Sequence, residues 1–313
     1  MTIQFEVIED PPADHKLWKQ WENLVYAQGW TSDDHSAMGL TPGFPTTKSV
    51  FAVTPGDHDF IGTVIWNEQD NIAFVGFFLL SPEHRGKGCG IQIWRRAMSR
   101  IPDDHLLGLR GVPAMVEKYK TLSVPVEGAT LAKFVMNVED FHAAMAKEVC
   151  ETYTSKFVSD LSEPEWAALL DYDLHVTGRD RKLFLEKYHN LDITTTLVFF
   201  DADHNIIGQI SCVPTLFPKD NTIKVSPLFA NSDQIALAAQ KQFSTVLQEK
   251  YPTAKLVFNI LDVGKGKMLK EFFGKFGVVA GVTGVTLFGS EIPKFGDLTK
   301  VYMPHNNPVH YDY

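Results

Sequence analysis

Three glycines and two cations lie within six consecutive positions, 85–90, of the segment SPEHRGKGCGIQIW. An apolar run at 72–80 precedes the segment, and an amphipathic helical pattern follows it. In a strand–turn–helix arrangement, main-chain N–H groups and the helix N-terminus converge on an anion, and glycine leaves no Cβ in the way. The segment therefore predicts a phosphate-binding loop.

Three phosphate-loop patterns compete for this segment. The dinucleotide pattern G-x-G-x-x-G fails, because Ile91 stands where its last glycine must be. The pattern G-x-x-x-x-G-K-[S/T] fails as well, because no glycine is followed in register by Lys and then Ser or Thr. The pattern R-x-x-G-x-G fits, with Arg85, Gly88 and Gly90. A glycine-rich surface turn without a ligand is the alternative.

With this loop between an apolar strand and a helix, the first half of the chain resembles the GCN5-related N-acetyltransferase (GNAT) superfamily, most specifically across LLSPEHRGKGCG. The resemblance implies acetyl-CoA as co-substrate and no metal. It implies that the pyrophosphate binds residues 86–90, that pantetheine runs along 78–80, and that a main-chain N–H near Leu80 polarises the thioester carbonyl. The cofactor-binding residues expected on this basis are Phe78, Leu79, Leu80, Arg85, Gly86, Lys87, Gly88, Cys89 and Gly90.

The resemblance also implies a general acid in the helix after the fifth strand. Tyr119 stands in register with the tyrosine that commonly protonates the leaving CoA thiolate, although Ser123 and Val124 depart from the usual Gly-Phe pair. The alternative is a core tyrosine on a helix face.

A base is needed because an amine with a pKa near ~10 must lose a proton before it attacks. The segment GWTSDDHSAM, 29–38, supplies Asp33, Asp34 and His35 where the family's acceptor-binding helices fall, and Asp34 is the predicted catalytic carboxylate. A capped helix start with acidic residues in its first turn explains the same residues.

Periodicity around the loop gives the order of the elements. A strand at 3–8 and a helix at 15–30 precede three antiparallel strands at 49–54, 60–66 and 72–80. A helix ending near Pro102, a strand at 105–111 and a helix at 113–122 follow the loop, and the strand at 129–137 is a candidate to close the sheet.

The second half repeats this plan. Residues 81–94 match 226–239 without a gap, GDHDFIGTVI at 56–65 matches ADHNIIGQIS at 202–211, and KYKTLSV at 118–124 corresponds to FFGKFGV at 272–278. Three landmarks in one order predict two copies of one fold. We expect an α/β (α+β) protein of two GNAT-type domains, 1–145 and 146–313, each with a mixed, mostly antiparallel sheet flanked by helices.

The second copy is predicted to be degenerate. In the ungapped match Ala230, Asn231, Asp233 and Ile235 replace Arg85 and the three glycines, and Phe273 replaces Tyr119. The pair therefore resembles tandem acetyltransferases with a degenerate YitH-type C-terminal domain, the segments 176–188 and 225–236 suggesting it most. An inactive copy of this kind is expected to wall the acceptor pocket.

The composition of the chain bears on its binding partners and on its location in the cell. A net charge of −9 disfavours nucleic acid. Three widely spaced cysteines and no leader-like or membrane-spanning segment predict a soluble cytoplasmic protein. His305 and His310 in the tail have no metal-like spacing. The expected partner is a small-molecule amine or peptide acceptor, with no nucleic acid and no membrane, and the oligomeric state stays open.

The sequence thus favours an acetyl-CoA-dependent N-acetyltransferase in which an amine attacks the thioester directly. Two alternatives stay open: a non-catalytic module that senses acyl-CoA, and an acyltransferase that uses a longer acyl-CoA.

Overall fold

The computed structural model of the chain describes residues 4–29, 34–216, 221–278, 281–294, 296–311 and 313. Within these residues thirteen strands belong to one continuous sheet, in the order β1-β2-β3-β4-β5-β12-β6-β11-β10-β9-β8-β7, and β13 pairs with β10 outside this order. Most neighbouring strands are antiparallel, whereas β4 with β5 and β10 with β11 are parallel. The expected α/β class with a mostly antiparallel sheet is confirmed.

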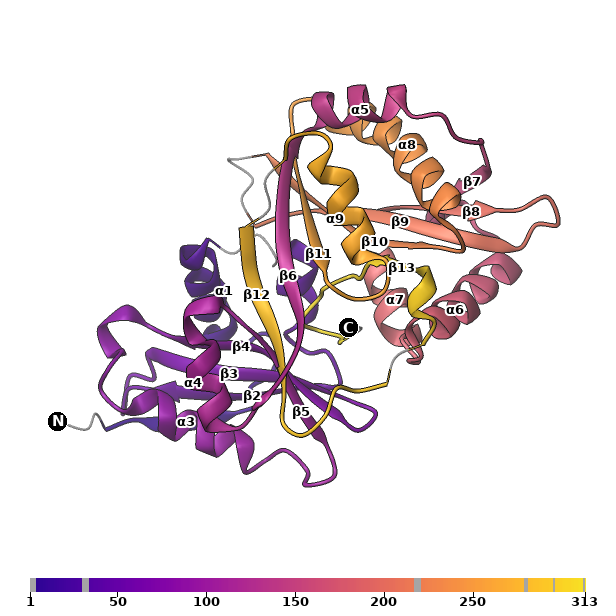
Figure 1. The fold of residues 1–313 in the computed structure, drawn as a ribbon. Helices are drawn as coiled ribbons and strands as arrows, with labels where there is room; N and C mark the ends of the chain where they lie inside the picture. Colours follow the sequence, from indigo (N-terminus) through magenta and orange to yellow (C-terminus); the bar gives the residue numbers. More distant parts are fainter. Residues whose placement is uncertain (1–3, 30–33, 217–220, 279–280, 295, 312) are drawn as a thin grey trace.

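The N-terminal half forms one end of the sheet (Figure 1). Its elements are β1 (Glu6–Glu9), α1 (Lys16–Gln28), α2 (His35–Leu40), β2 (Thr47–Val53), β3 (Phe60–Gln69), β4 (Ile72–Leu80), α3 (Cys89–Met98), β5 (Leu106–Gly111), α4 (Val116–Leu122) and β6 (Val126–Asn137). A linking helix, α5 (Val138–Lys147), follows.

The C-terminal half repeats the same order of elements. These are β7 (Thr154–Phe157), α6 (Glu163–Thr177), α7 (Lys182–His189), β8 (Thr195–Phe200), β9 (Ile206–Pro214), β10 (Thr222–Ala230), α8 (Asp233–Lys250), β11 (Lys255–Leu261), α9 (Gly266–Gly274) and β12 (Gly281–Phe288), and β13 (Val301–Met303) comes after the repeat. The prediction of two copies of one fold is confirmed.

Two strands are exchanged between the copies. β12 inserts beside β5, with Leu287 opposite Leu109, and β6 pairs with β11, with Lys133 opposite Asn259. The strand expected to close the first sheet therefore lies among strands of the second half, as the adjacent β6, β11 and β12 of Figure 1 show. The predicted boundary at 145/146 falls within α5 and stays a prediction.

Helices cover both faces of the N-terminal strands, so each face has its own core. On one face α3 and α4 contribute Trp94 and Tyr119 to a buried cluster with Val64. On the other face α1 brings Trp21 against Phe77. No helix within the described ranges is long and apolar enough to cross a membrane.

Candidate active site

The site begins where β4 and β5 separate. The two strands pair only from Ile72–Val75 against Leu106–Leu109. Gly76 then forms a bulge against β3, because Val75 faces Trp66 and Phe77 faces Ile65. A bulge bends its strand and increases its twist. Beyond it, β4 leaves β5, and a cavity of about 890 Å³ opens beside Phe78 and Leu80.

Main-chain groups of β4 face this cavity. Ser81 N donates to Ile61 O of β3 over 2.9 Å, so Ser81 uses its N–H toward β3. Successive residues of an antiparallel strand direct these groups alternately to the two sides. Phe78 and Leu80, an odd number of residues away, therefore turn their N–H and C=O groups toward the cavity.

The glycine loop forms the mouth of the cavity. Gly86 and Gly88 have φ values of 74° and 79°, a left-handed conformation that L side chains rarely adopt. A Cβ at either residue would meet no atom within 4 Å, so both face open space. Gly88 is the N-cap of α3, and neither a side-chain cap nor an acidic residue occupies the first turn. The N–H groups of this helix start are thus available to an anion.

The third glycine has a different role. A Cβ on Gly90 would lie 2.7 Å from Leu80 Cδ1, so glycine lets α3 pack closely on β4. Arg85 donates from Nε to Leu80 O over 3.0 Å, which fixes the guanidinium at the cavity mouth. These contacts hold the loop against the end of the strand.

The other predicted cofactor residues divide into two groups. Phe78 and Leu79 line the cavity, although the Leu79 side chain also belongs to the core on the α1 face. Lys87 is exposed and does not line the cavity. Cys89 is 1% exposed in the core, and burial raises the pKa of its thiol, so this group is not a nucleophile.

Tyr119 lies where a general acid is needed. Its ring packs near Trp94 and Phe78, with centroids 5.8 and 6.4 Å away, and it lines the cavity. Burial raises the pKa of Tyr119 to about 12, so the phenol stays protonated at neutral pH. Within the described residues its hydroxyl has no hydrogen-bond partner.

Asp34 lies behind the cavity wall and does not line it. It caps α2, where its Oδ1 accepts from the N–H groups of Ser36 and Ala37. Its Oδ2 accepts from Lys224 Nζ over 2.9 Å, and both side chains are at most 2% exposed. The geometry thus matches the capped helix start rather than an accessible base. His35 is the first residue of α2, and Asp33 lies outside the described residues.

Asp34→Asn is expected to lower the free energy of unfolding by about 3–5 kcal/mol, because it leaves Lys224 buried without its counter-ion. Urea denaturation followed by fluorescence measures this loss. The control Glu22→Gln removes an exposed pair with Lys19 and is expected to cost less than about 1 kcal/mol. Equal losses in the two variants would show that the buried pair has no structural role.

The C-terminal tail is a part of the site that sequence reasoning missed. Asn306, Asn307 and Pro308 line the cavity, and Pro308 packs onto the bulge, where a Cβ on Gly76 would come within 2.6 Å of it. Asn307 Nδ2 donates to Ser36 Oγ over 2.9 Å, and Lys224 Nζ donates to Asn306 O over 3.0 Å. The α2 cap and its ion pair therefore position the tail.

The wall of the cavity opposite β4 was also not predicted from the sequence, because the strands that form it are exchanged between the two copies. The cavity residues contributed by the strands β5, β6, β11 and β12 are Leu109, Arg110, Leu131, Lys133, Asn259, Thr283 and Gly284, of which Arg110, Lys133, Asn259 and Thr283 are polar. Their only sequence signal is polarity inside strands, and polarity does not reveal which strands become neighbours.

In the second copy the corresponding place is filled. β10 and β11 pair only from Thr222 to Val225, as β4 and β5 do before they separate. β13 then pairs with β10, with Met303 opposite Leu228. Tyr302 OH donates to Asp233 at the start of α8, and Ser232 caps that helix by accepting from Ile235 N. The chain's own strand and side chains therefore occupy this copy.

The ungapped match between the copies was wrong in its strand portion. Ser226 and Pro227 lie within β10 at its bulge, whereas Ser81 and Pro82 follow β4. Ala230 therefore ends a strand, as Leu80 does, and is not a replacement for Arg85. Only residues 231–232 separate β10 from α8, whereas 81–88 separate β4 from α3. The second copy has lost most of the loop, not only its glycines.

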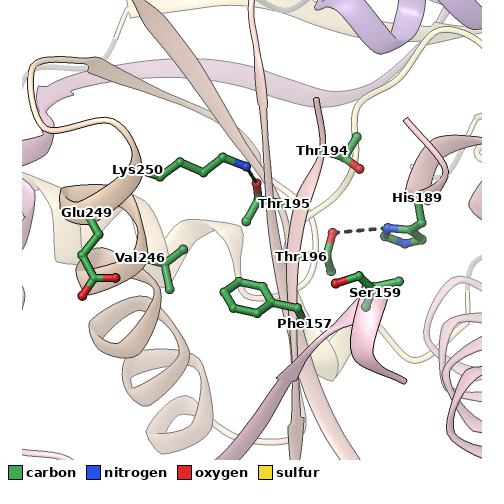
Figure 2. A pocket seen from close by; sticks show the side chains of 10 residues that line it. Phe157, Ser159, His189, Thr194, Thr195, Thr196, Val246, Glu249 and Lys250 are labelled. Carbon is green, nitrogen blue, oxygen red and sulfur yellow. Dashed lines mark hydrogen bonds between the residues drawn. The ribbon is translucent and has the colours of Figure 1, made fainter. Parts of the chain in front are cut away.

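A second cavity, of about 410 Å³, lies against β8 and the end of α8 (Figure 2). Its Lys250 donates to Thr195 Oγ1 over 2.7 Å, and His189 Nδ1 lies 3.3 Å from Thr196 Oγ1. Burial lowers the pKa of His189 to about 3, so the imidazole is neutral. No glycine is among the described residues that line this cavity, and its cation, Lys250, already donates to Thr195.

Within the described ranges no group of three His, Cys, Asp or Glu side chains is arranged to hold a metal ion. The described lining of the cavity beside β4 includes glycines, aromatic rings, amides and cations.

The chain is similar to one known protein in sequence and to several solved structures in fold. No family model matches the chain. An uncharacterized protein of Caenorhabditis elegans is 48% identical over 312 residues, which cover 99% of each chain. A tandem GNAT protein of the clavulanic acid biosynthesis pathway superposes with a TM-score of 0.68 at 13% identity, covering 93% of this chain and 100% of that one.

A candidate acetyltransferase from Pyrococcus horikoshii gives a TM-score of 0.66 at 15% identity, over 97% of this chain and 95% of that one. At such identities the likeness shows the fold alone. The chain belongs to the same family as the uncharacterized nematode protein, and its fold is the tandem fold of the GNAT superfamily.

Proposed function

We propose that the protein is an acetyl-CoA-dependent N-acetyltransferase that works through its N-terminal copy. One observation carries the proposal: the open edge of β4 leads from the bulge at Gly76 to an uncapped, glycine-rich helix start. In the second copy both features are filled, by β13 and by Ser232. An occupied copy beside an open one supports ligand binding in the open one.

The loop fits a pyrophosphate. Gly86 and Gly88 leave space in front of their main chain, Arg85 adds a positive charge at the mouth, and the start of α3 adds the helix dipole. The pantetheine arm would then run along β4 and pair with the main-chain groups of Phe78 and Leu80, as an added strand does.

The thioester carbonyl is better placed near the bulge than at Leu80. Leu80 adjoins the loop, and a strand rises only ~3.3 Å per residue, whereas the pantetheine arm spans several residues. If the pyrophosphate occupies the loop, the acyl end reaches the region of Gly76 and Phe78. Main-chain N–H groups there would stabilise the oxyanion.

In the reaction the amine nitrogen forms a bond to the thioester carbon, the C–S bond breaks, and the sulfur takes a proton. A tyrosine with a pKa of about 12 is a weaker acid than a thiol, whose reference pKa is ~8.5. We therefore expect Tyr119 to hydrogen-bond the developing thiolate and to pass on a proton only as the amine releases one.

None of the described cavity residues is Asp, Glu or His. The amine is therefore expected to bind neutral, or to lose its proton to water. The acceptor is proposed to be a small-molecule amine or a peptide, without nucleic acid or a membrane as partner. The free thiols Cys89, Cys150 and Cys212 support a cytoplasmic location, where cysteines stay reduced.

Gly88→Ala tests the loop. The added Cβ enters the space in front of the helix start, so we expect acetyl-CoA affinity to fall at least about tenfold, measured by isothermal titration calorimetry. Gly56→Ala is the matched control, because Gly56 has a φ of 82° and nothing within 4 Å of an added Cβ. The control is expected to lose similar stability, about 1–2 kcal/mol, and to keep its affinity.

Unchanged affinity in Gly88→Ala would remove the loop from the proposed site. Measuring CoA release with acetyl-CoA and with longer acyl-CoA, over a panel of amines, separates an acetyltransferase from a long-chain enzyme. Binding without release under every amine would favour a sensor instead.

A further inference from the structure

The cavity has a second cation-lined region, away from the glycine loop. Lys133 projects into it from β6, which β5 and β12 separate from β4. Three strand spacings of ~4.8 Å put β6 at least about 14 Å from β4, and the separation of β4 from β5 at the cavity adds to this distance. This is farther across the sheet than pantetheine would lie if it pairs directly with β4, so the region belongs to the acceptor side.

Lys133 is half-buried and has no ion pair or hydrogen bond within the described residues. Its neighbour across the sheet is Asn259, which lines the same cavity. Thr283 lies on the adjacent β12 and also lines the cavity, and its Oγ1 is buried with no hydrogen-bond partner in the described part of the chain. A cation and a hydroxyl donor are thus both available there.

The lining has one sign of charge. Its cationic side chains are Arg85, Arg110, Lys118 and Lys133, and no carboxylate side chain joins them among the described residues. Arg110 already donates to Asn306 Oδ1 and to Tyr313 O, so its charge is partly used by the tail. This differs from the chain as a whole, whose net charge is −9. A half-buried lysine without a counter-ion attracts an anion, and a charge-assisted hydrogen bond to a carboxylate is among the stronger polar contacts.

We propose that the acceptor is a primary amine that also carries a carboxylate, an amino acid being the simplest, and that Lys133 with Thr283 binds the carboxylate. This inference rests on the proposed acetyltransferase function and specifies its substrate class. The free cation and the unpartnered hydroxyl define the anion end of the acceptor site, while the acyl group marks its amine end.

An amino acid as the acceptor also makes a catalytic base less necessary. The α-amino group of a free amino acid is less basic than a simple alkylamine or a lysine-type amine, because the neighbouring carboxyl group withdraws electron density from the nitrogen. A larger fraction of it is therefore neutral near pH 7.5, and nearby cations disfavour its protonated form further. A dication or simple alkylamine would gain nothing from Lys133 and would need a carboxylate that the described lining lacks.

Matched acceptor pairs test the inference with the full chain. CoA release from acetyl-CoA is measured with glycine against methylamine and with phenylalanine against phenethylamine. In each pair we expect a higher kcat/KM for the amino acid than for the amine that lacks its carboxylate. Lys133→Gln is expected to lower kcat/KM for amino acids by about 10- to 100-fold, mainly through KM, and to leave the simple amines within about twofold.

Lys133→Arg should restore part of the amino acid activity, because it keeps the charge. Lys147→Gln, an exposed lysine at the end of α5, is the control and should match the wild type. Acetyl-CoA must raise the melting temperature of all these variants equally.

Methylamine and phenethylamine accepted as well as their amino acids, or an equal loss for both in Lys133→Gln, would overturn the inference and leave the enzyme assignment intact. Absence of CoA release with every amino acid would overturn it too. Absence of thermal stabilisation by acetyl-CoA would instead contradict the proposed function itself.

Discussion

Replacing Tyr119 with phenylalanine is expected to lower kcat for CoA release by about 100-fold, the lower range for a lost proton donor. The phenyl ring keeps the packing against Trp94 and Phe78, and no hydrogen bond within the described residues is lost. Acetyl-CoA affinity and the melting temperature should therefore stay close to those of the wild type. Steady-state kinetics and calorimetry on the same preparation measure the two effects.

The pH profile gives a second readout of the same residue. Because burial raises the pKa of Tyr119 to about 12, its acid form persists until the pH approaches that value. Loss of this group's proton should therefore not reduce kcat between pH 7 and 10, where amine deprotonation raises the rate. Tyr153→Phe, at a half-buried tyrosine that does not line the cavity and whose hydroxyl donates to Glu151, is the control and should not change kcat. An unchanged kcat in Tyr119→Phe would mean that water protonates the thiolate.

Local features of the site could be predicted from the sequence. The loop depends on consecutive residues, so Arg85, Gly86, Gly88 and Gly90 could be placed at a helix start after a strand from their order alone. Tyr119 could be placed by its position in the helix after the next strand. Strand–turn–helix geometry fixes such neighbours, because few residues separate them.

Non-local features could not be predicted. Periodicity predicts the strand at 129–137, which is part of β6, but it does not show that β6 and β12 exchange partners, so Lys133 and Thr283 gave no signal of a shared cavity. The Ser-Pro pair occurs in both halves, but it cannot be used to align them. It lies at a bulge within β10 in the second copy and after the end of β4 in the first. The resemblance puts Asp34 in the acceptor-binding region, but the sequence does not show that its carboxylate pairs with Lys224, which is 190 residues away.

The pairing of β13 with β10 gives a physical reason why the second copy has no open site. A parallel pair that separates leaves main-chain groups of β10 without a strand partner, and buried groups of this kind must be satisfied. β13 pairs with β10 there, so a ligand is not required for a stable fold. The same tail then continues to the bulge of the open copy, where Pro308 packs on Gly76. The second copy therefore contributes the C-terminal tail, with Pro308, to the wall of the candidate active site.

The tail that joins the two copies is expected to make the protein sensitive to acid. His305 and His310 are only 2% and 5% exposed. Burial, reinforced by the nearby charge of Arg181, holds the pKa of both imidazoles well below the usual value. Arg181 lies 3.0 Å from His305 Nδ1, and the His310 ring stacks on Phe184 at 5.4 Å. Both side chains are therefore neutral in the folded protein.

The sign of the effect follows from proton binding. An unfolded histidine takes up a proton below pH ~6.5, whereas these two stay neutral when folded, so the stability that they contribute is complete above pH 6.5 and falls as the pH drops. Each contributes a slope of at most about 1.4 kcal/mol per pH unit, and the buried His189, whose pKa is lowered to about 3, adds a third contribution of the same sign. Urea denaturation at pH 7.5, 6.5, 5.5 and 4.5 should show the free energy of unfolding falling more and more steeply below pH 6.5.

His310→Phe removes one of these three protons. The phenyl ring preserves an aromatic contact with Phe184 and removes the titrating group, so the slope below pH 6.5 should fall by about one third. His175→Gln, at a side chain 61% exposed, is the control and should keep the wild-type slope. Because Asn306 and Asn307 of the same tail line the cavity, CoA release should be lost along the same acid limb. A slope unchanged in His310→Phe would show that His310 takes no part, and the acid sensitivity would then have to come from other groups.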